Sequence, residues 1–361
     1  MTEGNAELAA VRPGEEQDWN RLETWIRAAL DDQLDLAAAM ETLQFPAGSA
    51  NLTYLVRFGP TELVVRRPPF GPVAPGAHDM AREYRVLSRL WRIFPPAPRA
   101  YAFCDDEAVL GAPFFVMERR HGVVVYDTIP ESLARYPDAA RRVSLALVDA
   151  MAEFHGLDPA AADLADLGRP DGFLERQLGG WSKRWQLAQV DGVPALGATM
   201  DDLHRRLVAH RPEPARVSLV HNDLKLDNCQ FHPDDPDRVT AIFDWDMTTL
   251  GDPLVDLGTL LGYWPDPKDD ATRAPRPAWD ALGLPPRAEI ALRYAERTGT
   301  PLSRIAWYEA FALWKTAIVI QQIYVRYVRG QTRDPRFADR GARVPVLAGL
   351  ARDVLDRAGF T

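Results

Sequence analysis

Two short stretches in the second half of the chain carry residue types that could bind a metal ion and activate a hydroxyl group. The sequence HNDLKLDN, which begins at His221, contains Asp223 and Asn228, and Asp244 follows the apolar residues AIF sixteen positions after Asn228. Phosphoryl transfer to an alcohol requires a carboxylate that accepts the hydroxyl proton and oxygen ligands that hold magnesium on the phosphates. Asp223 could accept that proton, and Asn228 and Asp244 could bind Mg²⁺, which prefers oxygen ligands.

Two plainer interpretations of these residues stay open. They could be a chance cluster of polar loop residues, or His221 and Asp223 could belong to a hydrolase metal site. The elements around them are therefore part of the argument.

Those elements change in character along the chain. The first third contains short segments rich in branched and aromatic residues and broken by Pro and Gly, a pattern typical of strands. After Gly122 apolar residues recur mainly at helical spacing. These patterns predict an α+β protein with two lobes, a small antiparallel β-sheet lobe over 1–117 and a larger, mostly helical lobe over 118–361. The expected strands are 42–45, 52–58, 63–66, 99–104, 108–117, 218–220 and 240–243, and the expected helices are 17–30, 79–91, 138–155, 173–187, 200–210, 287–297 and 305–328.

Composition excludes several classes of protein. The net charge of −9 argues against a general nucleic-acid binder, because neutralising phosphates requires a basic surface. No run of about eighteen apolar residues occurs, so no membrane-spanning helix is expected. The first ten residues lack the basic and apolar regions of an export signal, which predicts a cytoplasmic protein. Cys104 and Cys229 belong to no CxxC or Cys/His cluster, so both are expected to be buried and free. The oligomeric state is not readable from the sequence.

The stretch HNDLKLDN resembles the H-x-D-x-x-x-x-N loop shared by protein kinases and aminoglycoside phosphotransferases, and Asp244 lies where those proteins have their magnesium aspartate. The resemblance implies a protein-kinase-like fold, ATP and Mg²⁺ as cofactors, and a hydroxylated small molecule as substrate. It assigns Asp223, Lys225, Asn228 and Asp244 to the catalytic set, with Asn228 and Asp244 as metal ligands. His221 is expected to be a packed structural residue.

Further segments follow the order of that family, although each has a plainer interpretation. The turn after residue 46 resembles a turn that covers the nucleotide phosphates, and the end of the strand 108–117 resembles the hinge whose backbone binds adenine. Without the resemblance, the first would be an ordinary hairpin turn and the second a buried strand leading into a loop. The residues concerned are Gly48, Ser49 and Asn51 in the turn and Met117, Glu118 and Arg119 in the hinge.

One position departs from the family pattern. The lysine that binds the α- and β-phosphates should lie in the segment LVVR, which ends at Arg66, but no lysine precedes Lys183. Arginine keeps the charge and offers a planar fork suited to phosphate and carboxylate. Arg66 is therefore expected to bind the phosphates and to pair with Glu83, which matches the family's helix glutamate.

The segment GDPLVDL, which begins at Gly251, also fits the GDP-x-x-D-L pattern of phosphotransferases. Either Asp252 or Asp256 is expected to brace the HNDLKLDN loop through backbone hydrogen bonds, and Asp252 could also cap a helix. The strings VVRRPPFG and REYRVL are most similar to the branch that contains the kinase-like domain fused to some acyl-CoA dehydrogenases.

The predicted activity is ATP-dependent phosphorylation of a small metabolite. Only eleven residues separate Asp244 from Asp256, too few for the activation segment of a protein kinase. A weakly active nucleotide-binding pseudokinase and an aminoglycoside-type antibiotic kinase stay as alternatives. The region 304–340 carries seven basic residues, which favours an anionic or neutral acceptor, such as a hydroxy acid or hydroxyacyl thioester, unless they form a solvated face. Four aromatic residues could line an acceptor site or belong to the core: Tyr263, Trp264, Trp307 and Trp314.

Overall fold

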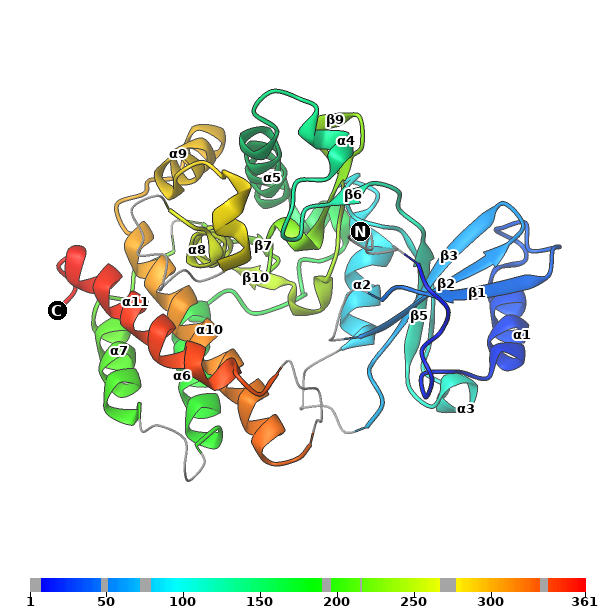
Figure 1. The fold of residues 1–361 in the computed structure, drawn as a ribbon, viewed down its shortest axis with the longest axis horizontal. Helices are drawn as coiled ribbons and strands as arrows, with labels where there is room; N and C mark the ends of the chain where they lie inside the picture. The colour runs from blue at the N-terminus through cyan, green and yellow to red at the C-terminus, as the bar shows by residue number, and fades with distance from the viewer. Residues whose placement is uncertain are drawn as a thin grey trace. The chain divides into compact units, whose positions relative to one another are not determined.

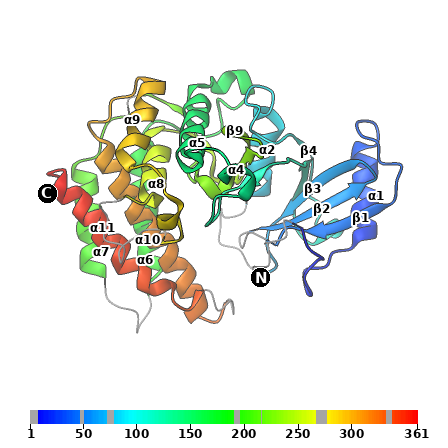
Figure 2. The same cartoon turned by 45° about the horizontal axis from the view of Figure 1, so that its top comes forward.

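The computed structural model describes residues 8–46, 51–71, 79–189, 196–214, 216–266, 277–331 and 337–361. The chain forms two compact units (Figures 1 and 2). The first contains residues 1–122, 160–164 and 240–248, and the second contains 123–159, 165–239 and 249–361. Asp244 therefore belongs to the first unit, although it follows the HNDLKLDN loop in sequence. The division expected from the sequence, between residues 117 and 118, does not include the two later segments.

A five-stranded antiparallel sheet organises the first unit. Its strands lie in the order β1-β2-β3-β5-β4, and each neighbouring pair is antiparallel. This arrangement confirms the predicted meander and the small sheet lobe. The strands are β1 (Met40–Gln44), β2 (Leu52–Phe58), β3 (Thr61–Arg67), β4 (Ala100–Cys104) and β5 (Phe114–Glu118).

Helices pack on both faces of this sheet. Alternate strand residues, among them Tyr54, Val65 and Val116, form one apolar cluster with α1 (Trp19–Leu30), because successive strand side chains point to opposite faces. Arg66 follows Val65 and points to the other face, where α2 (Met80–Leu90) lies. The alternation of the β3 sequence thus separates the core from the residue expected to bind phosphate.

The prediction of one strand over 108–117 was wrong in its first part. Residues Glu107–Leu110 form a short helix, α3, and only Phe114–Glu118 form β5. The Asp106 carboxylate accepts a hydrogen bond from the Ala108 N–H, and Gly111 ends the helix at φ 74°. Both residues are strong helix boundary signals, so the local capping chemistry outweighed the apolar composition.

The second unit is mainly helical, as predicted, and contains two small sheets, β10-β7 and β6-β8-β9, except that residues 240–242 at the end of β9 belong to the first unit. No helix in the described part of the chain is long and apolar enough to cross a membrane. The helices are α4 (Glu131–Ala134), α5 (Ala139–Gly156), α6 (Phe173–Leu187), α7 (Gly197–Ala209), α8 (Leu254–Tyr263), α9 (Arg287–Thr298), α10 (Ile305–Val328) and α11 (Arg343–Arg357), and the strands are β6 (Val123–Val124), β7 (Ser218–Val220), β8 (Cys229–His232), β9 (Asp235–Ile242) and β10 (Thr249–Gly251).

The packing of α8 on α10 positions the residues that follow the GDP turn. Gly258 of α8 lies so close to α10 that a Cβ at this position would be 2.6 Å from the Tyr308 backbone. Any larger residue would force the helices apart. The Tyr308 hydroxyl donates to Asp252 Oδ2 at 2.5 Å, which joins the start of α8 to α10.

Candidate active site

The HNDLKLDN loop, residues 221–228, connects β7 to β8 in the second unit and presents Asp223 within a group of polar side chains. The Lys225 ammonium donates to Asp223 Oδ2, and the Tyr263 hydroxyl lies 3.5 Å from Asp223 Oδ1. Asn228 Nδ2 donates to the Asp223 backbone carbonyl at 2.8 Å. The Asp223 side chain is 21% exposed, so it remains accessible to a substrate hydroxyl.

The carboxylate of Asp223 keeps the Lys225 side chain positively charged. Burial alone would lower the pKa of Lys225, but the attraction of Asp223 outweighs burial and raises it. The same ammonium lies 5.5 Å from the Tyr263 ring centre, a cation–π distance. A cation is therefore fixed beside the carboxylate that would accept the hydroxyl proton.

Asp256 of α8 braces the start of this loop. Its two carboxylate oxygens each accept a backbone hydrogen bond at 2.6 Å, Oδ2 from the His221 N–H and Oδ1 from the Asn222 N–H. Oδ2 also lies 3.0 Å from His155 Nε2. These contacts confirm that one aspartate of GDPLVDL braces the loop and identify it as Asp256. Asp252 accepts from the Leu254 N–H at 3.0 Å and thus caps α8.

The side chain of Lys315 in α10 binds the same loop at a different backbone atom. Its Nζ donates to the Asn222 carbonyl at 3.1 Å, so Asn222 is fixed at its N–H by Asp256 and at its carbonyl by Lys315. Asn222 has a φ of 69°, a left-handed conformation that asparagine tolerates better than most residues. Burial lowers the pKa of Lys315 and the nearby charges of Asp223 and Asp256 oppose that shift. Lys315 is one of the seven basic residues of the region 304–340, and its burial was not predicted.

Replacing Asp256 with asparagine is expected to lower the free energy of unfolding by about 3 kcal/mol or more at pH 7. An amide has one acceptor oxygen, so its NH₂ group would face a buried N–H. The hydrogen bonds of His155 and the His221 backbone outweigh burial and lower the pKa of Asp256. This group therefore stabilises the fold above the ordinary aspartate pKa, and its contribution is lost as the pH falls through the lowered value.

Urea unfolding at a series of pH values measures this effect. The control is Asp201→Asn, an exposed position of α7 where a change below about 0.5 kcal/mol is expected. An Asp256→Asn protein as stable as the parent at pH 7 would contradict the brace.

A second group of predicted residues lies in the first unit. Arg66 Nε is 3.2 Å from Glu83 Oε2, which confirms the expected pairing of β3 with α2. Arg66 also pairs with Asp244 Oδ1 through its Nη2, a contact that the sequence analysis did not predict. Glu83 is 1% exposed and Arg66 is 8% exposed. One guanidinium therefore joins the helix glutamate to the expected metal ligand.

Burial has a strong effect on this group. It raises the pKa of Glu83 to about 8, and Asp244 and Asp246 add to the rise while Arg66 opposes it. For Arg66, burial would lower the pKa, but the attraction of Glu83 and Asp244 outweighs it and keeps the guanidinium charged. Because a carboxyl group with a pKa of about 8 is largely protonated at pH 7, Asp244 is the main countercharge of Arg66 at that pH.

The remaining residues expected to bind nucleotide are placed only in part. Gly48 and Ser49 lie outside the described residues, and Asn51 immediately precedes β2. Glu118 makes two hydrogen bonds to the Arg99 backbone. The Glu118 N–H donates to the Arg99 carbonyl at 2.9 Å, and the Glu118 side-chain Oε1 accepts from the Arg99 N–H at 2.7 Å. The Glu118 N–H is therefore committed to the protein.

The expected metal ligands fit magnesium by their chemistry. Asn228 uses its amide nitrogen to donate to Asp223, so its side-chain oxygen is the atom available to a cation, and Asp244 supplies a carboxylate. No group of three His, Cys, Asp or Glu side chains among the described residues could hold a metal by itself. Magnesium typically takes one or two protein ligands and completes its shell with phosphate oxygens and water, which is what this donor set allows.

The other predicted residues are structural. His221 is fully buried, and both cysteines are buried and free, as expected. Three of the four aromatic residues proposed as core or acceptor wall, Trp264, Trp307 and Trp314, are buried. Tyr263 contacts the HNDLKLDN loop through Asp223 and Lys225.

Comparison with known proteins agrees with this fold. The model of a phosphotransferase enzyme family, APH, matches residues 41–291. The chain therefore belongs to this phosphotransferase family.

Its relatives include two curated mammalian proteins. Acyl-CoA dehydrogenase family member 10 of Mus musculus is 31% identical over 89% of this chain, and acyl-CoA dehydrogenase family member 11 of Homo sapiens is 30% identical over 91% of it. The chain spans only 30% and 42% of their respective lengths. The sequence similarity to the acyl-CoA dehydrogenase-fused branch is thereby confirmed.

Solved structures show the same fold. A putative aminoglycoside phosphotransferase from Ralstonia eutropha JMP134 is 30% identical, with a TM-score of 0.74, and the match covers 95% of this chain and 99% of that one. A thermostable mutant of aminoglycoside phosphotransferase APH(4)-Ia, solved with AMP-PNP and hygromycin B, has a TM-score of 0.57 at 16% identity, covering 94% and 98%. The second likeness shows the fold alone.

Proposed function

We propose that this protein is an ATP- and magnesium-dependent phosphotransferase that moves the γ-phosphate to a hydroxyl group of a small molecule. The observation that carries the proposal is the environment of Asp223. Its carboxylate is accessible, pairs with Lys225, and lies on a loop whose backbone Asp256 and Lys315 hold at three atoms. A fixed carboxylate of this kind is what phosphoryl transfer requires from the protein.

Each residue then has a defined role. Asp223 orients the acceptor hydroxyl and accepts its proton, and Lys225 offsets the negative charge of the transferring phosphate. Arg66, held by Glu83, binds the α- and β-phosphates. Asn228 and Asp244 hold magnesium, which neutralises charge on the phosphates when bound. The hinge segment 117–119 binds adenine, with Arg119 rather than Glu118 as the backbone donor.

An anionic or neutral acceptor suits the site better than a polycation. One ammonium group, that of Lys225, is fixed beside Asp223. By charge complementarity it favours a hydroxylated anion, such as a hydroxy acid or its thioester, over an aminoglycoside. Of the seven basic residues between 304 and 340, Arg304, Arg326, Arg329 and Arg340 are exposed.

A screen for acceptor-dependent ATP consumption tests the proposal. The library contains hydroxy acids, hydroxyacyl thioesters, neutral polyols and aminoglycosides, and each compound is tested with the parent, Asp223→Ala and the surface control Asp201→Asn. Turnover of a hydroxylated anion by the parent and by Asp201→Asn, but not by Asp223→Ala, is expected. Turnover of kanamycin-type compounds alone would contradict the acceptor preference, and ATP consumption unaffected by Asp223→Ala would contradict the activity.

Replacing Arg66 with methionine is expected to raise the KM for ATP at least tenfold, because a charge-assisted hydrogen bond contributes roughly 1.5–3 kcal/mol. Arg66→Lys keeps the charge but loses the planar fork that reaches Glu83 and Asp244 together, so an intermediate KM is expected. Arg57→Met is the matched control, since Arg57 lies on β2 and pairs with Glu62. An unchanged KM in Arg66→Met would show that Arg66 does not replace the family's lysine.

A further inference from the structure

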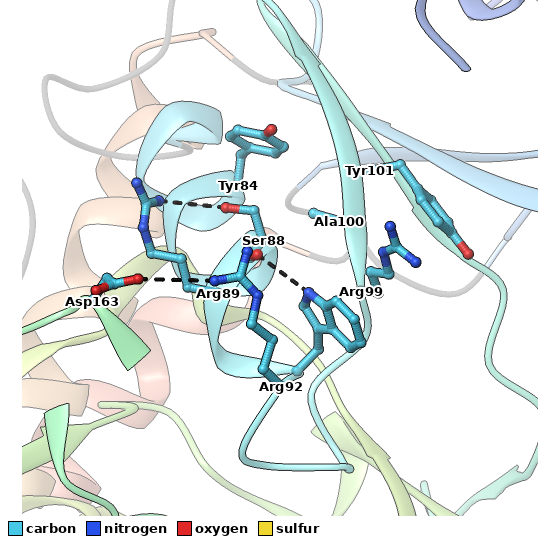
Figure 3. A pocket seen from close by; sticks show the side chains of 9 residues that line it. Tyr84, Ser88, Arg89, Arg92, Arg99, Ala100, Tyr101 and Asp163 are labelled. Atoms are coloured by element: carbon cyan, nitrogen blue, oxygen red, sulfur yellow. Dashed lines mark hydrogen bonds and ion pairs between the residues drawn. The ribbon is translucent and has the colours of Figure 1, made fainter. Parts of the chain in front are cut away.

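A pocket of about 400 Å³ lies in the first unit, between α2 and the start of β4, outside the group formed by Arg66, Glu83 and Asp244. Its walls carry three arginines and several aromatic rings (Figure 3). The residues used below are Tyr84, Arg89, Trp91, Arg92, Arg99 and Tyr101. None of them has a role in the proposed phosphotransfer.

Arg99 packs against two aromatic rings in this pocket. Its guanidinium carbon is 4.7 Å from the ring centre of Trp91 and 4.7 Å from that of Tyr101, so aromatic rings pack against the guanidinium (Figure 3). Within the described ranges, no carboxylate or carbonyl accepts from the Arg99 side chain. Its backbone is fixed by the two hydrogen bonds to Glu118. Stacking leaves the N–H edge of the guanidinium to bind an oxyanion at little entropic cost.

The neighbouring charges make the pocket basic. Arg89 is anchored to α2 by a hydrogen bond from its Nη1 to the Arg85 carbonyl at 3.0 Å. Arg92 lies 3.9 Å from Asp163 Oδ2, and these side chains are 56% and 76% exposed, so their ion pair is weak. Asp163 is the one carboxylate among the described residues that line the pocket. Three guanidinium groups therefore face one acidic side chain.

From these contacts we propose that the pocket binds the phosphate monoester of a small planar or aromatic molecule. Arg99 forms a bidentate pair with the phosphate, Arg92 leaves Asp163 to add a second contact, and the rings of Tyr84, Trp91 and Tyr101 contact the organic part. A volume of about 400 Å³ lies within the usual range for small-molecule sites. The inference does not depend on the phosphotransferase activity, because it concerns binding alone.

Calorimetric titration of the full chain with phenyl phosphate, without nucleotide or magnesium, tests this site. The parent is expected to bind, and Arg99→Met is expected to weaken binding at least tenfold, since it removes the bidentate pair. Arg21→Met removes the same charge from α1 of the same unit at a residue that does not line the pocket, and it should bind as the parent does.

Asp163→Asn is expected to change the affinity for phenyl phosphate in the opposite direction. Removing the competing carboxylate is expected to strengthen phenyl phosphate binding about two- to threefold, because Arg92 is released. Inorganic phosphate should bind more weakly than phenyl phosphate, since it makes no contact with the rings. The proposal is overturned if the parent shows no binding at millimolar phenyl phosphate, if Arg99→Met binds as the parent does, or if Asp163→Asn binds more weakly.

Discussion

Asp223→Asn is expected to lower kcat by about 10³-fold while the KM for ATP changes less than about threefold. Asparagine has nearly the same shape but cannot accept the acceptor's proton. The Lys225 ammonium would keep an oxygen partner but lose the opposing charge of its ion pair. The residues proposed to bind nucleotide are different ones, so the effect is expected on the transfer step.

Steady-state kinetics with the best acceptor from the screen measure this change. Asp234→Asn is a suitable control, because Asp234 is 65% exposed and pairs only at the surface with Arg135. Equal circular dichroism spectra and melting temperatures would show that the variants remain folded. A kcat within tenfold of the parent would contradict the role of Asp223 as base.

Asp244→Asn is expected to lower kcat/KM by about 10³-fold and to raise the magnesium concentration needed for half-maximal activity at least tenfold. A neutral amide is a weaker ligand for a hard cation than a carboxylate. Because Asp244 also pairs with Arg66, the variant leaves Arg66 bound mainly to Glu83. Excess Mg²⁺ or Mn²⁺ should therefore restore part of the activity.

Magnesium titrations of activity test the metal role directly. Asp105→Asn is the control, since this exposed aspartate belongs to the same unit and its loss should leave the magnesium dependence unchanged. A parent-like magnesium dependence in Asp244→Asn would remove this residue from the metal site.

Much of the fold follows from the sequence where one face of an element is buried and the other is not. The residues 173–187 and 305–328 are helices with the predicted bounds, because their apolar residues recur with helical spacing. Only the start of α8 was suggested, by the possible cap at Asp252. Its extent was not predicted because residues 254–262 are all buried, and a helix buried on every side shows no amphipathic pattern. The α11 helix was not predicted either. It contains a proline at position 345, which usually argues against a helix but is tolerated in the first turn.

The candidate site was likewise predicted from the sequence only in part. Arg66 and Glu83 were predicted to pair because both match motif positions, and the structure confirms the pair. The contact of Arg66 with Asp244 could not be predicted, because it joins residues 178 positions apart. Lys315 was missed as a brace of the loop, although its apolar neighbours in the sequence LWKTAIV were a signal of burial. The role of such a lysine depends on how far its side chain is buried and on which group it contacts, and residue type alone shows neither.

A crystal structure of the protein with magnesium and a non-hydrolysable ATP analogue tests the central claim most directly. The account predicts one Mg²⁺ with the Asn228 side-chain oxygen and an Asp244 carboxylate oxygen each about 2.1 Å away, and the Asp223 carboxylate turned toward the γ-phosphate. A nucleotide bound through a metal that touches neither residue, or Asp223 directed away from the γ-phosphate, would contradict it.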